Sequence, residues 1–358
     1  MKTFLKILAG FLIVVILLIT GLNLYFNDER LKSTVLPALR ENTGSDIQVE
    51  RMSLSILRSL PNVGFSMQNL MIPTPEGDTV ATADEIIISV DPFSLFGDRI
   101  SVSSLSINRT ELRYIVRQDS TTNIDFLMAA EEQPADTAEA VELSISSFDL
   151  NNATILYEDL TAGTSAELRN LTADLSLEFG QLIRSTVDAE LESLGLTVGG
   201  SRIVNNLSLG LQQTSTLDLE NEVFEFSEGS FSIRGLRLNV TGSFSGWSSE
   251  SPQISMQFNS SSDNFGELLR LAPEEYSEEL SGLETRGSLA LEGNIDGAFT
   301  EQSLPQFNIR VEVNDGFLQN PDLPQALEEI QLTANVSNEL ATVDTFTVRA
   351  GENRLQGS

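Results

Sequence analysis

The chain has 358 residues and carries 21 Lys and Arg against 52 Asp and Glu, a formal net charge of −31. A surface this negative repels nucleic-acid phosphates over a screening length of about 10 Å, so we expect no nucleic-acid partner. Cys and His are both absent, which excludes thiol and imidazole catalysis, disulfides, and metal sites built from nitrogen and sulfur ligands. We therefore expect no enzyme activity, no cofactor and no metal site.

The chain begins with a six-residue segment (1–6) that carries Lys2 and Lys6, followed by an uncharged apolar segment over residues 7–26. Its twenty residues, at about 1.5 Å each in a helix, are enough to cross a hydrocarbon core of about 30 Å. The preceding lysines favour a cytoplasmic N-terminus. The apolar segment is also longer than the core of a cleaved signal peptide. We predict a single-pass membrane helix with the bulk of the chain on the far side of the membrane.

Residues 27–46 are predicted to form a helix that ends near Gly44 and is kinked or divided at Pro37. Two interpretations stay open: a helix that caps the following domain, or a helix that lies in the membrane interface. The apolar positions at helical spacing are Leu31, Val35, Leu36 and Leu39.

From residue 47 onward, short runs of alternating apolar and polar residues are separated by turn-forming residues. This pattern predicts a mainly β protein, an antiparallel sheet with one apolar face. Two short helices are expected, over residues 123–130 and 264–271. An acidic, aromatic-free segment over residues 131–142 is predicted to be a linker or loop. It separates a first β region (47–130) from a second (143–358).

Two segments of the chain recur. Residues 100–114 match residues 143–157 at an offset of 43, and residues 238–246 match residues 289–297 at an offset of 51. In the first pair, the alternation changes phase across a Ser-Ser dipeptide in both copies, as a β-bulge would produce. These repeats suggest a sheet that grows by adding hairpins, although generic hairpin chemistry explains them equally well.

Carboxylates are the remaining candidates for chemistry, but no pair in the sequence is singled out as an acid and a base. Solvated surface charge is the simpler interpretation. The Asp-Gly dipeptides 296–297 and 315–316 lack the spacing of a calcium loop and are predicted to be hairpin turns. The carboxylate clusters are Asp84-Glu85; Glu131, Glu132 and Asp136; and Glu274, Glu275, Glu278 and Glu279.

Several segments, taken in order, resemble AsmA-family envelope proteins: residues 80–108 and 123–127, then the Phe-x-x-Leu-Leu-x-Leu-x-Pro segment within 264–276, then 287–297 and 313–324. The resemblance implies an inner-membrane anchor and a periplasmic part similar to bridge-like lipid-transfer proteins. It also implies an elongated, curled antiparallel β-sheet that forms a groove for phospholipid tails. Residues 47–130 would be the N-terminal AsmA-like region, and residues 143–358 a groove region that continues beyond residue 358.

The apolar positions of the predicted strands would line either an ordinary core or such a groove, and the alternation by itself does not separate the two. The resemblance implies the groove. The candidate lining residues are Ile86, Ile88, Val102, Leu105, Ile107, Leu143, Ile145, Phe148, Leu150, Leu289, Leu291, Ile309, Val311 and Val313.

The predicted function is the binding or conduction of phospholipid along the groove, contributing to outer-membrane assembly and envelope lipid homeostasis. The expected partners are phospholipid, the inner membrane through residues 7–26, and envelope proteins. The alternative is a membrane-anchored assembly protein of closed β-sandwich modules that acts through protein contacts. A carboxylate-dependent envelope hydrolase is a third hypothesis.

Overall fold

The computed structural model describes residues 25–59, 62–92, 94, 101–129, 142–272, 280, 282–300, 304–321 and 324–357. The predicted cytoplasmic segment 1–6 and the predicted membrane span 7–26 lie outside this part of the chain, except for Tyr25 and Phe26. The acidic segment 131–142 lies outside it except for Glu142. Within the described ranges, no helix is both long enough and apolar enough to cross a membrane.

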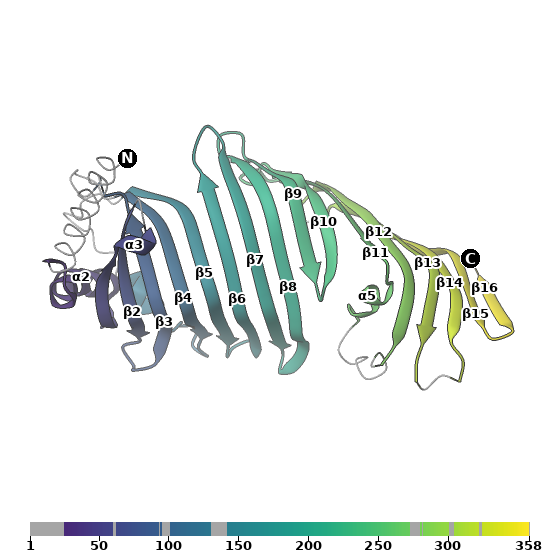
Figure 1. Cartoon of the computed structure of the whole chain (residues 1–358), viewed down its shortest axis with the longest axis horizontal. Helices are drawn as coiled ribbons and strands as arrows, with labels where there is room; N and C mark the ends of the chain where they lie inside the picture. The colour runs from purple at the N-terminus through teal and green to yellow at the C-terminus, as the bar shows by residue number, and fades with distance from the viewer. Residues whose placement is uncertain are drawn as a thin grey trace, which may run out of the picture. The chain divides into compact units, whose positions relative to one another are not determined.

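The protein is mainly β, as predicted: sixteen strands form one open sheet in which the spatial order equals the chain order (Figure 1). The strands are β1 (Gln48–Ser55), β2 (Val63–Pro73), β3 (Thr79–Val90), β4 (Ser101–Val116), β5 (Glu142–Asp159), β6 (Thr164–Glu178), β7 (Ile183–Val198), β8 (Ser201–Asp218), β9 (Val223–Ile233), β10 (Leu236–Ser245), β11 (Gln253–Ser262), β12 (Glu284–Ala298), β13 (Gln306–Gln319), β14 (Leu327–Ser337), β15 (Ala341–Ala350) and β16 (Asn353–Gly357). The helices are α2 (Asp28–Thr43), α3 (Ile56–Ser59), α4 (Asp125–Ala129) and α5 (Gly266–Leu269).

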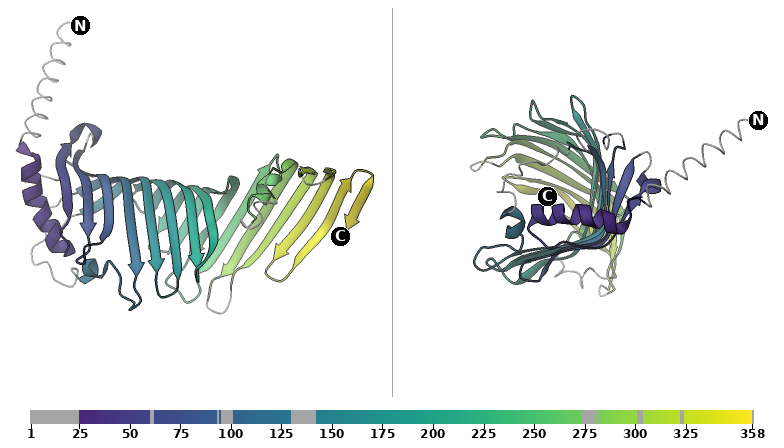
Figure 2. Two further views of the ribbon diagram at one scale, coloured as in Figure 1. Left: turned by 90° about the horizontal axis from the view of Figure 1, so that it is seen from below. Right: turned by 90° about the vertical axis from the view of Figure 1, so that its left-hand side faces the viewer.

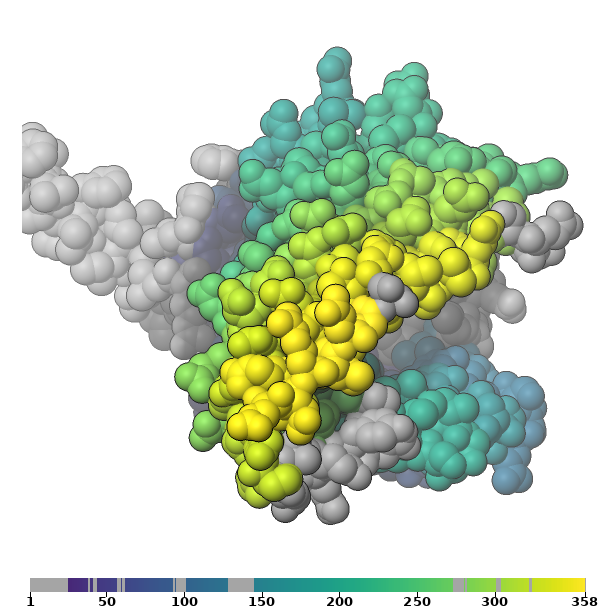
Figure 3. Space-filling model, turned by 90° about the vertical axis from the view of Figure 1, so that its right-hand side faces the viewer, coloured from purple at the N-terminus to yellow at the C-terminus, as the bar shows by residue number. Residues whose placement is uncertain are grey.

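The chain folds as two compact units. The first unit contains residues 1–174 and 196–203, and the second contains residues 175–195 and 204–358. The last strand of the second unit, β16, is exposed along its whole length and lies at the surface shown in Figure 3. The described strands form a single sheet, so the closed sandwich of the alternative hypothesis, which needs two stacked sheets, is not found in this part of the chain.

The strands β4 and β5 run parallel, which corrects the prediction of a wholly antiparallel sheet. Leu105 lies beside Phe148, and Tyr114 lies beside Tyr157, with their rings stacked 5.8 Å apart. The offset of 43 in the sequence repeat is therefore the register of two neighbouring strands. The direction is parallel because the chain passes through α4 and residues 130–141 between the two strands, which is long enough for a crossover connection.

Single residues with positive φ interrupt the strands of the first unit: Asn69 in β2, Arg109 in β4 and Asn152 in β5, with φ of 50°, 46° and 55°. At each of these positions the apolar alternation shifts by one residue, so that apolar side chains stay on one face while the strand bends. Residues 101–116 and 142–159 are therefore single bent strands. The register also shifts between Val102 and Ser104, at the Ser-Ser dipeptide predicted to form a bulge.

The predicted hairpin turns at the two Asp-Gly dipeptides are wrong, because both dipeptides lie inside strands β12 and β13. Asp315 has a φ of 51° and forms a bulge beside Gly287 of β12, which has a φ of 114°. A Cβ atom on Gly287 would lie 2.6 Å from the Cα atom of Gly316. Only a glycine allows the two strands to approach this closely, and Asp315 supplies the positive φ without a reversal of chain direction.

Helix α2 packs on the apolar face at the start of the first unit (Figure 2). It is a continuous helix through Pro37, it begins after Asn27, whose side chain accepts from the Arg30 N–H, and it ends at Gly44 in the left-handed conformation. The core beneath it is formed by Leu31, Ile47, Val49, Met52, Met67 and Leu70, with Val35, Leu36, Leu39, Ile86 and Ile88 packed against it.

An acidic side chain ties α2 to β1: Asp28 Oδ1 accepts from the Met52 N–H at 2.6 Å, and Asp28 Oδ2 accepts from Lys32 Nζ at 3.0 Å. The Met52 hydrogen bond and, less strongly, Lys32 lower the pKa of Asp28 below its ordinary value of 3.8. A carboxyl whose pKa is depressed on folding stabilises the fold above its ordinary pKa, and this stabilisation is lost as the pH falls through the lower folded value.

We expect Asp28→Ala to lower the free energy of unfolding by about 1 kcal/mol at pH 7, a value reduced from that of a buried charged hydrogen bond because the side chain is half exposed. The difference from wild type should shrink as the pH is lowered from 7 through the depressed pKa of Asp28, where the carboxylate becomes protonated. Thermal unfolding of the two proteins across this pH range measures it. Glu29→Ala in the same helical turn is the control, and an equal loss for both variants would contradict the role of the Met52 contact.

Candidate functional site

Rows of apolar side chains cross the first unit perpendicular to its strands. One row contains Met52, Met67, Ile86, Ile107 and Leu150, each directly opposite the next in register. Residues opposite each other in neighbouring strands point to the same face of a sheet. These rows therefore form one apolar face across β1 to β5. A second row contains Leu54, Phe65, Ile88, Leu105 and Phe148.

The second unit repeats this arrangement with more aromatic residues. One row contains Val240, Phe258, Gly293, Ile309 and Val336, across β10 to β14. The next contains Phe226, Gly242, Met256, Ile295 and Phe307, across β9 to β13. The ring of Phe258 lies over Gly293, because a Cβ atom there would come within 2.3 Å of the ring.

Helices cover this apolar face at two places only in the described parts of the two units. In the first unit α2 covers the rows near β1. In the second unit Phe265, Leu268 and Leu269, in and beside α5, pack on Leu236, Leu289 and Val313, which are at most 3% exposed. Away from these covers most apolar side chains of the rows are half-buried, and Val336 is exposed. A half-buried apolar face of this extent is unusual for a protein surface.

The predicted lining residues divide between covered and open positions. Leu289, Leu291 and Val313 are buried, and Ile86 and Ile88 pack against the α2 core. The open, half-buried positions are Val102, Leu105, Ile107, Ile145, Phe148, Leu150, Ile309 and Val311, although Val311 touches the α5 core. The backbone of Leu143 pairs with Val102, and its side chain lies outside the described atoms.

Sequence reasoning missed the aromatic part of this face, which is carried by β9 to β11. Phe224 and Phe226 meet edge to face with ring centroids 4.6 Å apart. Phe244 lies opposite Phe224, and Phe258 follows on β11. The signal was present in the sequence, because these phenylalanines stand at alternate positions of predicted strands.

The opposite face of the sheet is polar. Asp84 Oδ2 accepts from Arg109 Nε at 2.5 Å, and Glu85 accepts from Ser66 Oγ at 2.9 Å. This neighbouring carboxylate pair is therefore held by separate partners. The other predicted carboxylate clusters lie outside the described residues, within which no group of acidic residues could hold a metal ion.

One carboxyl on the polar face has an altered pKa. Partial burial of Asp149 in β5, with the nearby Asp174 carboxylate as a second cause, raises the pKa of Asp149 above its ordinary value. Ser147 Oγ donates to Asp149 Oδ2 at 3.3 Å, which opposes the rise. Asp149 lies opposite Ser106 and therefore on the side of the sheet away from Leu150.

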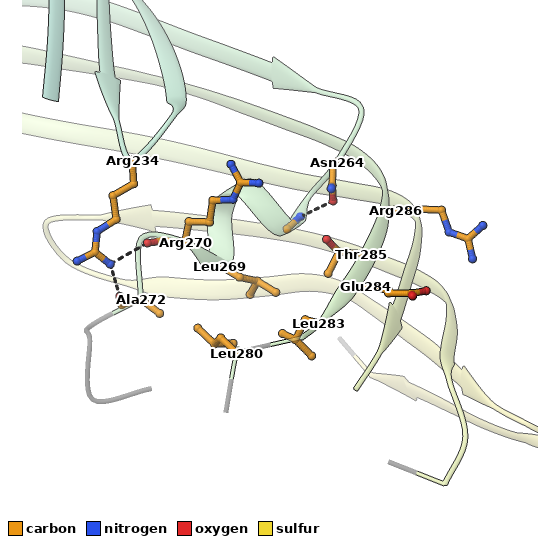
Figure 4. A pocket seen from close by; sticks show the side chains of 11 residues that line it. Arg234, Asn264, Leu269, Arg270, Ala272, Leu280, Leu283, Glu284, Thr285 and Arg286 are labelled. Atoms are coloured by element: carbon orange, nitrogen blue, oxygen red, sulfur yellow. Dashed lines mark hydrogen bonds between the residues drawn. The ribbon is translucent and has the colours of Figure 1, made fainter. Parts of the chain in front are cut away.

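A cavity of about 660 Å³ lies beside α5 in the second unit (Figure 4). Its walls come from the β9–β10 turn, the end of α5 and the start of β12, and its apolar part is formed by Leu269, Ala272, Leu280 and Leu283. Arg234 Nη1 donates to the carbonyl oxygens of Arg270 and Ala272 at 3.0 and 3.1 Å, which ties the turn to the end of α5.

A comparison with protein families supports the resemblance found in the sequence. The model described as the AsmA family matches residues 1–264. The chain belongs to the AsmA family. The match ends at the residue before Phe265, so the resemblance of residues 265–324 to family versions with the Phe-x-x-Leu-Leu-x-Leu-x-Pro segment stays a prediction. No curated protein and no solved structure matches the chain significantly.

The residues matched by the AsmA-family model include the whole first unit, which contains the α2 cap and the parallel β4–β5 pair. They also include the second unit as far as residue 264. The aromatic rows of β9 to β11 therefore lie within the matched part of this AsmA-family chain. The α5 cover and the cavity beside it lie almost entirely beyond the matched part.

Proposed function

We propose that this AsmA-family protein binds or conducts phospholipids along the apolar face of its sheet, and so contributes to outer-membrane assembly and envelope lipid homeostasis. In this proposal residues 7–26 anchor the chain in the inner membrane, and the bulk of the chain is periplasmic. The protein performs no catalysis and makes contacts with other envelope proteins.

One observation carries the proposal: apolar rows cross successive strands within each unit, and most of their side chains stay half-buried with no second layer over them in the described part of the chain. Acyl chains that lie on this face would remove the remaining apolar surface from water, at about 25 cal/mol per Å². Headgroups would stay in water at the edges. The polar opposite face and the net charge of −31 keep such a protein soluble.

The absence of native cysteine makes a direct test simple, because a single introduced cysteine is the only labelling site. Val240→Cys places an environment-sensitive fluorophore on the apolar face, and Thr241→Cys places it on the adjacent exposed position of the polar face. With the full chain held in amphipol, vesicles of phosphatidylethanolamine and phosphatidylglycerol should shift the emission of the label at residue 240 to shorter wavelength. The label at residue 241 should respond little.

A response of equal size at both positions would indicate adsorption of the whole protein to vesicles. The absence of a response at residue 240, together with no phospholipid retained by the purified chain in mass spectrometry, would contradict the proposed function.

A further inference from the structure

The cavity beside α5 has an unusual charge for this protein. Among the described residues, three arginines, Arg234, Arg270 and Arg286, line it together with one carboxylate, Glu284. The chain as a whole carries 52 acidic against 21 basic residues. Some other arginines of the second unit are paired with carboxylates, as Arg310 is with Glu312 and Arg349 with Glu328 and Glu329. Within the described residues, the three cavity arginines have no such ion pair.

Arg234 is held in place by backbone contacts. One of its nitrogens is bonded to two backbone carbonyls, and its other N–H groups make no hydrogen bond within the described part of the chain. Arg270 follows α5 directly, and its Nη1 lies against the β9–β10 turn, 3.6 Å from the place that a Cβ atom on Gly235 would take. Arg234, from the β9–β10 turn, and Arg270, at the end of α5, both line the cavity (Figure 4). Arg286 instead lies over the ring of Phe317, 4.1 Å from its centroid.

The apolar part of the lining is formed by Leu269, Ala272, Leu280 and Leu283, and Asn264, Gly266 and Thr285 complete it among the described residues. Leu269 also belongs to the core that α5 forms with Leu289 and Val313, so the cavity borders the apolar face. A guanidinium group matches the geometry of phosphate oxygens and binds them with charge-assisted hydrogen bonds. Apolar walls next to such groups suit a ligand that carries a phosphate and hydrocarbon together. A volume of about 660 Å³ is in the range of small-ligand sites.

We propose that this cavity binds the phosphate headgroup of an anionic phospholipid, with Arg234 and Arg270 as the phosphate-binding residues and the leucines in contact with the first methylenes of the acyl chains. The site rests on the proposed function, because the acyl chains would continue onto the apolar face. With this site, the cavity beside α5 would distinguish a phospholipid, which carries a phosphate, from a neutral lipid, which does not.

The test compares two fluorescent lipids with the same acyl chains, phosphatidylglycerol and diacylglycerol, binding to the full chain in amphipol. Wild type should bind phosphatidylglycerol about tenfold more tightly, the effect of one good charge-assisted contact. Arg270→Gln should remove this preference and leave diacylglycerol binding unchanged, because no hydrogen bond of the fold depends on its guanidinium in the described part of the chain. Arg234→Gln is a second variant with the same expected result, checked by thermal unfolding for loss of its carbonyl contacts.

Arg237→Gln is the matched control, since Arg237 is an exposed arginine of the same hairpin on the polar face. An unchanged preference in both Arg270→Gln and Arg234→Gln, with normal binding of both lipids, would overturn the headgroup site and leave the proposed function standing. If neither lipid binds to wild type, the proposed function itself fails. Inorganic phosphate and unlabelled phosphatidylglycerol are also compared as competitors of the fluorescent phosphatidylglycerol. If both displaced it equally well, the site would be assigned to soluble phosphate and the lipid assignment would be overturned.

Discussion

Ile309→Glu is expected to abolish phospholipid binding at the apolar face of the second unit while the protein stays folded. Ile309 is half-buried in the row that joins Phe258, Gly293 and Val336. Without lipid, a glutamate there keeps access to water, and the loss of half an apolar side chain costs about 1 kcal/mol. With lipid, the carboxylate would be enclosed by acyl chains, which costs at least about 3 kcal/mol and corresponds to more than a hundredfold weaker binding.

Two further glutamate variants serve as controls for this prediction. Asn308→Glu places the same charge one residue earlier on the exposed polar face and should change neither binding nor stability. Leu289→Glu places it at a position that is 1% exposed beneath Phe265, where an enclosed charge should cost several kcal/mol and unfold the second unit. Lipid binding and thermal unfolding are measured for all three. If Ile309→Glu destabilised the protein as much as Leu289→Glu, the face at Ile309 would be a closed core.

Gly287→Ala is expected to lower the free energy of unfolding by about 3 kcal/mol. Gly287 has a φ of 114°, which strains any other residue, and its added Cβ would lie 2.6 Å from Gly316 Cα and 2.7 Å from the Asp315 carbonyl oxygen. Both obstacles are backbone atoms and cannot rotate away. Relief would need the β12–β13 bulge to open, next to the buried pair Leu289 and Val313.

Gly77→Ala separates strain from collision. Gly77 has a similar φ of 99°, but a Cβ atom there would have no other atom within 4 Å. Its cost should be about 1 kcal/mol, from the backbone conformation alone. Unfolding midpoints in urea compare the two variants with wild type. Equal shifts would mean that the close approach of β12 and β13 contributes nothing to stability, contrary to the geometry at Gly287.

The alternation of apolar and polar residues was sufficient to predict a mainly β chain and one apolar face. A strand has a side-chain period of two, so the pattern in segments such as 84–90 or 306–313 fixes which side chains share a face before any tertiary contact forms. The signals that predict helix α2 are also local, because Asn27, the apolar positions of α2 and Gly44 lie within the helix or at its ends.

The continuity of the bent strands was visible in the sequence but was interpreted wrongly. The phase shift between Ile107 and Leu112 looks like the end of one strand and the start of another. One residue in the left-handed conformation, Arg109, produces the same phase shift within a single strand. Asp315-Gly316 was predicted to be a hairpin turn but lies inside a strand. A dipeptide that favours positive φ is compatible with a bulge as well as with a hairpin turn, so the sequence alone does not distinguish them.

Tertiary structure alone decided three further features. The direction of β5 depends on how the chain crosses back after β4, which no local pattern encodes. Whether an apolar residue is covered or open depends on a distant segment: α5 lies over Leu289 and leaves Ile309 half-buried, although both have the same alternation in sequence. Arg234 and Arg270 meet at one cavity because the β9–β10 turn lies beside the end of α5. The sequence by itself therefore determined the strands and their apolar side, since these follow from neighbours along the chain, whereas the open face and the cavity depend on contacts between residues far apart in it.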